Sequence, residues 1–253
     1  MVDRSGLTDE QGIELGQPNR PLEEGLADVD RRSYSAHLFV RALIKIRRTH
    51  RTYRKEGDAE FPTESLRGIT RRFADLLAHE EWRLLGLPTL RLLSSRLATH
   101  SLNSAVYATH LAISAGLSSR TAGELGAGVL IDDFRRLKGL DHERSRTGEP
   151  AAYDRNIAAL AEHLGPPPSS TAQRLADIIA FERGLPLDTS IPDGFYMVKR
   201  NVHAAGRIVQ VARQYDSLVQ GFGGHEAHTP SRALSALLDT PDTKCDPALK
   251  RLF

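Results

Sequence analysis

Apolar residues recur at steps of three and four between Thr99 and Lys138, the spacing that places them on one face of a helix. Gly116 divides the stretch into two predicted helices, because glycine commonly follows the last turn of a helix. The second helix carries an apolar run that ends in Asp132 and Asp133. A carboxylate beside so apolar a run needs a partner if it is buried. This helix pair is therefore the predicted centre of the molecule.

Two interpretations are open for the start of the second helix. Ser118 or Ser119 can act as its N-cap. Alternatively, Thr121 and Glu124 have the spacing of a capping box. Small side chains follow on this helix and let a neighbouring helix approach closely; they are Gly123, Ala127 and Gly128.

The rest of the hydrophobic pattern is helical as well. The predicted helices cover residues 33–53, 63–79, 82–97 with a break near Pro88, 151–164, 170–183 and 198–219, and a last one begins at Pro230 behind a Thr229 cap. Residues 139–150 have no hydrophobic period and are predicted to form a polar loop. No segment alternates apolar and polar residues for long enough to indicate a strand, so the fold class is all-α.

The pattern divides the chain into four parts. Residues 1–30 are rich in Gly, Pro, Asp and Glu without a sustained period, and we expect a mobile tail. Residues 31–95 are expected to form an N-terminal helical region and residues 96–240 the main helical domain. Residues 241–253 are expected to form a C-terminal tail.

The helix predicted over residues 33–53 has a basic face opposite its apolar one. The cations of that face are Arg41, Lys45, Arg48 and Arg51. A charge run of this kind is usually a solvated helix face. Neither nucleic acid nor a membrane is therefore an expected partner.

Composition adds few constraints. A chain of 253 residues with 40% hydrophobic content can bury a full core, and its formal net charge is only +2. Cys245 is the single cysteine, which excludes an internal disulfide framework and a thiolate metal cluster. No apolar run is long enough for a transmembrane helix, and no signal peptide is recognisable. We therefore expect a cytoplasmic protein.

Three segments resemble a known family. HSLN from His100 and GAGVLIDDFR at residues 126–135 are similar to the first two motifs of the HD metal-dependent phosphohydrolases. AGRIVQVARQYDSLVQG at residues 205–221 resembles a later helix of their HD-GYP branch, the bacterial cyclic di-GMP phosphodiesterases. The resemblance covers about residues 35–240. It implies an HD-domain-like helical bundle with an N-terminal helical extension.

Most of the metal-binding motifs of that branch are changed in this chain. Ile131 stands where the family has a histidine, and Arg213 stands where it has a metal-binding aspartate. Alignment on Asp188 puts Arg183 in one of the paired histidine positions, and a second alignment of that segment also lacks both histidines. In the middle His-Pro motif, only the proline that follows Glu149 is kept.

The resemblance leaves vestigial metal-site positions at His100, Asp132, Glu149 and Asp188. A binuclear hydrolase needs several His and carboxylate ligands to hold its cations and to lower the pKa of a bridging water. The permanent charge of Arg213 also repels a metal ion. We therefore expect no catalytic residue, no metal and no other cofactor. The alternative is a divalent metal held weakly by His100 and Asp132.

Two roles are open for the arginine near the vestigial site. Arg213 can pair with Asp132, which in turn can bond His100, and so replace the metal inside the core. Alternatively, Arg135, Arg183 and Arg213 can line an open cleft and bind a phosphate group.

These observations predict a catalytically degenerate HD-GYP-like domain, a pseudoenzyme that serves bacterial signal transduction as a ligand-binding or protein-interaction module. A cyclic dinucleotide or a signalling protein is the expected partner, and a homo-oligomer is compatible with the sequence. The alternative is a metal-dependent phosphohydrolase with a reduced metal site, acting on cyclic di-GMP or another phosphate ester.

Overall fold

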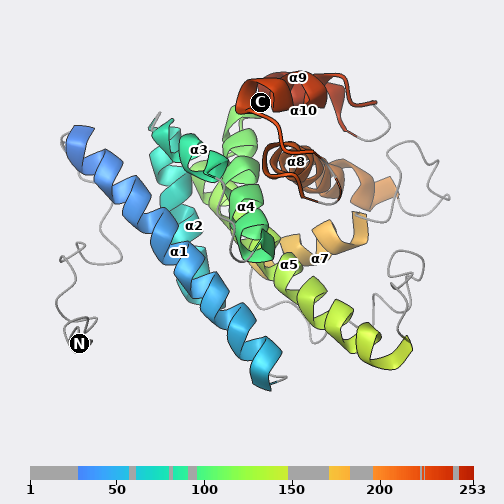
Figure 1. Ribbon diagram of the computed structural model, residues 1–253. Helices are drawn as coiled ribbons and strands as arrows, with labels where there is room; N and C mark the ends of the chain where they lie inside the picture. The colour runs from blue at the N-terminus through green and yellow to red at the C-terminus, as the bar shows by residue number, and fades with distance from the viewer. Residues whose placement is uncertain are drawn as a thin grey trace, which may run out of the picture.

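The all-α prediction is confirmed. The computed structural model describes residues 28–56, 61–79, 82–90, 96–147, 171–182, 196–222, 224, 226–241 and 245–253, and every regular element among them is a helix (Figure 1). The elements are α1 (Asp28–Glu56), α2 (Thr63–Ala78), α3 (Arg83–Gly86), the 3-10 turn η1 (Leu87–Thr89), α4 (Arg96–Ser114), α5 (Ser119–Thr147), α7 (Thr171–Glu182), α8 (Tyr196–Gln220), α9 (Pro230–Leu238) and α10 (Pro247–Leu252). The helix predicted over residues 151–164 lies outside the described residues.

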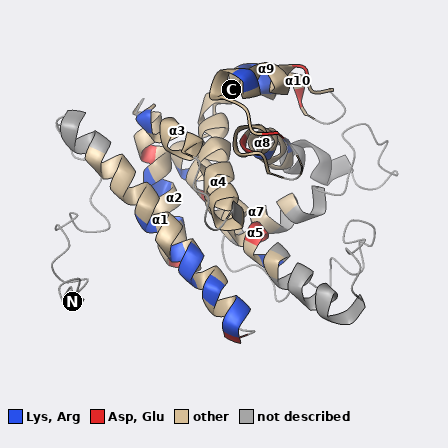
Figure 2. Ribbon diagram, viewed as in Figure 1, with Lys and Arg blue, Asp and Glu red and all other residues tan. Residues whose placement is uncertain are grey.

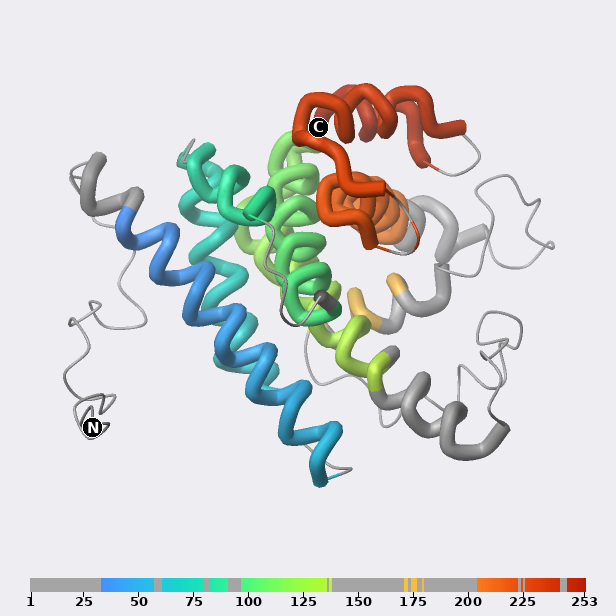
Figure 3. Tube along the Cα trace, in the orientation of Figure 1, coloured from blue at the N-terminus to red at the C-terminus, as the bar shows by residue number. Residues whose placement is uncertain are grey.

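Helix α4 is the central element of the bundle. Every residue from Ala98 to Ala112 is buried, because α1, α2, α5 and α8 all pack against α4. Figure 3 shows α4 between α1 and α2 on one side and α8 on the other. One hydrophobic core runs from Leu38 in α1 to Leu237 in α9. The N-terminal helical region and the predicted main domain therefore share this core.

The close approach predicted at the small residues of α5 is confirmed. A Cβ atom on Gly123 would lie 2.8 Å from the Cα of Arg71 in α2, and one on Gly128 would lie 3.0 Å from the Cβ of Leu175 in α7. Glu124 is buried beside the first of these contacts. Arg71 and Arg67 reach its carboxylate at 2.6 and 2.8 Å. Two arginines thus neutralise this acid between α2 and α5, which the sequence pattern alone does not reveal.

The helix ends agree with the capping predictions. Gly116 has a φ of +86°, a conformation that only glycine adopts readily, and it separates α4 from α5. The Ser118 hydroxyl accepts a hydrogen bond from the Thr121 N–H at 3.2 Å, which makes Ser118 the cap. Thr229 accepts from the N–H of Arg232 at the start of α9.

Two helix boundaries differ from the prediction. Helix α1 begins at Asp28, inside the expected tail, and α5 continues to Thr147 through the expected polar loop. The residues after Lys138 include the good helix formers Leu, Glu and Arg, and no proline occurs before Pro150. A lack of hydrophobic period therefore does not exclude a helix here.

The expected C-terminal tail contains a docked helix, α10. Asp246 caps it by accepting from the N–H groups of Ala248 and Leu249 at 2.8 and 3.2 Å, and it pairs with Arg207 of α8 at 2.9 Å. Phe253 packs against Tyr215 with 4.3 Å between ring centroids. The C-terminus therefore belongs to the bundle. No helix among the described residues is long and apolar enough to cross a bilayer.

Candidate functional site

His100 faces α8 from the buried side of α4. Its Nδ1 lies 2.6 Å from Oδ2 of Asp216, and Asn103 donates its amide to the other oxygen of that carboxylate at 2.8 Å. The His100 ring stacks on Phe222, with 4.2 Å between centroids. His100, Asn103 and Asp216 are all buried. The contact with Asp216 therefore holds the edge of the His100 ring, and stacking on Phe222 holds its face.

Arg213 faces the carboxylates that end the apolar run of α5. Its guanidinium donates to Asp132 at 2.8 Å and to Asp133 at 2.5 Å. The side chains of both acids are at most 2% exposed, and that of Arg213 is 14% exposed. The predicted pair of Arg213 with Asp132 is confirmed, and Asp133 makes it a triad. The predicted hydrogen bond between His100 and Asp132 is wrong, because the carboxylate bonded to His100 is that of Asp216.

Helix α8 joins these two groups into one polar centre. Arg213 and Asp216 are three residues apart, so they lie on the same side of α8. Burial raises the pKa of Asp216, while its hydrogen bonds to His100 and Asn103 and the charge of His100 act in the opposite direction. The nearby Asp133 carboxylate raises this pKa further. The polar centre therefore contains three acids, and a permanently charged guanidinium contacts two of them.

The residues at this centre do not fit a divalent cation. A metal ion would have to bind Asp132 and Asp133 while the guanidinium of Arg213, whose charge is permanent, contacts both carboxylates. Within the described part of the chain, no three His, Cys, Asp or Glu side chains come together in a way that could hold a metal ion. The hydrogen bonds and ion pairs of this centre connect α4, α5 and α8.

The other predicted site residues do not all lie in the described structure. Glu149, Arg183 and Asp188 lie outside the described residues, so their predicted roles stay predictions. Arg135 is on α5 and is half-buried. The open anion-binding cleft predicted for Arg213 is wrong, because its guanidinium is directed into the bundle towards two carboxylates.

Sequence reasoning missed Asp216 and Asn103 as members of the site. Both are in segments that carry the family resemblance, HSLN and RQYDSL, which is the signal that could have identified them. Comparisons of the chain with family models, with curated proteins and with solved structures found no match.

Proposed function

We propose that the chain is a catalytically degenerate HD-GYP-like domain that acts in signalling as a ligand-binding or protein-interaction module. The contact of Arg213 with Asp132 and Asp133 carries this proposal. In the family that the sequence resembles, this region of the bundle would bind the metal ions that activate water. Here a side-chain cation neutralises the carboxylates, and this supports a role that needs no turnover.

Two measurements on the purified full chain test the proposal. Elemental analysis should find no stoichiometric transition metal, and incubation with cyclic di-GMP and added Mn²⁺ should leave the dinucleotide intact. One or more tightly bound metal ions per chain would contradict the proposal. So would metal-dependent hydrolysis that disappears in His100→Ala, because His100 is the family's first ligand position. A titration with cyclic di-GMP then separates a dinucleotide ligand from a protein partner.

A further inference from the structure

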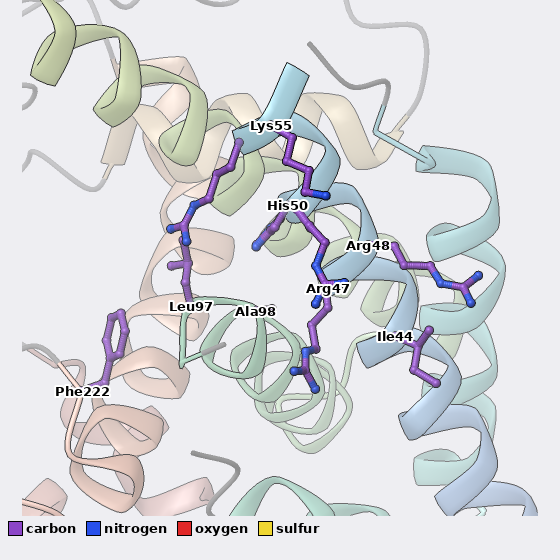
Figure 4. Close-up of a pocket in the computed structure, with 10 residues that line it drawn as sticks. Ile44, Arg47, Arg48, His50, Lys55, Leu97, Ala98 and Phe222 are labelled. Atoms are coloured by element: carbon purple, nitrogen blue, oxygen red, sulfur yellow. The ribbon is translucent and has the colours of Figure 1, made fainter. Parts of the chain in front are cut away.

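A basic pocket opens beside the polar centre and shares with it only Phe222, on which His100 stacks. It has a volume of about 740 Å³ and lies between the C-terminal half of α1, the start of α4 and Phe222, the second residue after α8. The cations that line it are Arg47, Arg48, Arg51, Arg54 and Lys55. Figure 4 shows Arg47 and His50 on one side of the opening, with Leu97 and Phe222 on the other.

The described side chains that line this pocket include five cations and no acid. The sequence has no Asp or Glu between Arg31 and Lys55. Figure 2 shows the resulting concentration of basic residues on the C-terminal half of α1. Arg48, Arg51 and Arg54 are exposed, and within the described residues none of them makes an ion pair. Their guanidinium groups are therefore available to a ligand.

A solvated helix face does not account for this arrangement. Cations near the end of a helix are favourable with its dipole. However, Arg47, Arg51 and Lys55 follow one another at intervals of four residues, and like charges at that spacing destabilise a helix. They also line a partly enclosed cavity that α4 and Phe222 complete. An anion in the cavity would relieve the repulsion.

We infer that this pocket binds a small molecule that carries two or more phosphate groups. Arginine forks match the geometry of phosphate oxygens and hold them by paired, charge-assisted hydrogen bonds. From Arg47 to Lys55 the cations extend over about 12 Å of helix, at ~1.5 Å per residue, which is too far for a single phosphate group to contact them all. The cavity is within the range of small-molecule sites, about 300–1,000 Å³.

The side of the pocket opposite the arginines determines which phosphate-containing ligands it can accept. Leu97, Ala98 and Phe222 are apolar, so an organic group attached to the phosphates can pack there. Inorganic polyphosphate and a nucleoside polyphosphate share the chemistry that the arginines recognise. The inference goes beyond the proposed function and does not depend on it, because the pocket uses neither Arg213 nor the acids of the polar centre.

Calorimetric titration of the full chain with inorganic triphosphate and, separately, with adenosine triphosphate tests the inference. We expect saturable one-to-one binding that weakens as salt rises, with the two anions competing. Tighter binding of the nucleotide would identify an organic ligand, and equal binding would identify the phosphates as the whole determinant. The double variant Arg51→Gln/Arg54→Gln should bind about tenfold more weakly or worse, a loss of at least about 1.4 kcal/mol.

A matched control removes the same charge elsewhere. Arg41→Gln/Arg232→Gln alters two exposed arginines that do not line the pocket, and we expect its affinity to stay within about twofold of wild type. The pocket variant should melt no lower than wild type, because it loses like-charge repulsion. This excludes unfolding as the cause of weaker binding.

Three results would overturn the inference. They are the absence of saturable binding, an equal loss of affinity in the pocket and control variants, and tight binding of a single-stranded oligonucleotide or of anionic phosphatidylserine vesicles that triphosphate fails to displace. None of them bears on the metal and hydrolysis measurements. The inference about the pocket and the proposed function can therefore be rejected independently of each other.

Discussion

Arg213 supplies the positive charge between two buried carboxylates of α5. The guanidinium contacts two carboxylates that are almost fully buried, and it is itself mostly buried. Removing one partner from a buried ion pair leaves an uncompensated charge, which is far costlier than removing the whole group. The three side chains should therefore behave as a unit in mutagenesis.

Arg213→Ala is expected to lower the free energy of unfolding by roughly 3–5 kcal/mol, measured by urea denaturation at neutral pH. The triple variant Arg213→Ala/Asp132→Asn/Asp133→Asn should recover much of that loss, because no buried carboxylate is then left without its guanidinium. Strictly additive losses would contradict the triad. Arg207→Ala is the control: its ion pair with Asp246 is more exposed, and its loss should cost about 1 kcal/mol or less.

Sequence reasoning found the pair of Arg213 with Asp132 because the family resemblance places both residues around one metal site. It did not find the partner of His100. Which acid faces His100 depends on the rotation and axial position of α8 against α4, and these are set by packing along the whole helix. Residues more than a hundred positions apart, such as His100 and Asp216, are brought together only by that packing.

At the scale of elements, the small residues of α5 set how closely its neighbours pack. Gly123 meets the backbone of α2, while Gly68, inside α2 itself, has nothing within 4 Å of where a Cβ would lie. The two glycines occupy the same kind of secondary structure but different surroundings. Substitution with alanine should therefore change stability in opposite directions.

Gly123→Ala is expected to destabilise the protein by about 1–3 kcal/mol, because a methyl group there would force α2 and α5 apart. Gly68→Ala should stabilise it by about 0.5–1 kcal/mol, since alanine is the better helix former and meets no obstacle. Thermal and urea unfolding of both variants measure the difference. Equal effects of the same sign would show that the α2–α5 contact is looser than described.

The element boundaries that sequence reasoning missed have a common cause. Helix α10 is six residues long, too short to show a hydrophobic period. The sequence Asp246-Pro247 nevertheless indicates its start, because Asp246 is the N-cap and proline occupies the first helical position. The helical residues of α5 beyond Lys138 also lack an apolar stripe. Hydrophobic periodicity detects helices that bury one face. Capping residues and helix propensity are the signals for helical segments that have no apolar stripe.

At the scale of the whole molecule, stability depends on pH through His50. This side chain is buried between α1 and α5, with its ring facing Phe134 at 6.0 Å between centroids. Burial lowers the pKa of His50 from 6.5 to about 4. The unfolded chain therefore takes up a proton near pH 6.5, while the folded protein resists protonation until about pH 4. The stability contribution is complete above pH 6.5 and is lost as the pH falls towards 4.

Between pH 7 and pH 4 this residue alone should remove about 3 kcal/mol from the free energy of unfolding. His50→Gln, which cannot be protonated, should show a shallower decline in that window. Urea titrations at intervals of pH measure the two curves. They should run parallel above pH 7, where His50 is neutral in both states, and parallel curves below pH 6 would contradict the buried neutral histidine.

The polar centre also has a consequence for synthesis on the ribosome. Asp132 and the arginine that neutralises it are separated by 81 residues, and His100 and Asp216 by 116. At roughly 5–20 residues per second, Arg213 leaves the peptidyl transferase about 4–16 s after Asp132. Throughout that interval the nascent helices α4 and α5 lack the charges that α8 supplies. Glu124, in contrast, finds Arg67 and Arg71 already made. Helix α2 can therefore dock against α5 before the chain leaves the ribosome, whereas the contacts of the polar centre can form only after α8 has been synthesised.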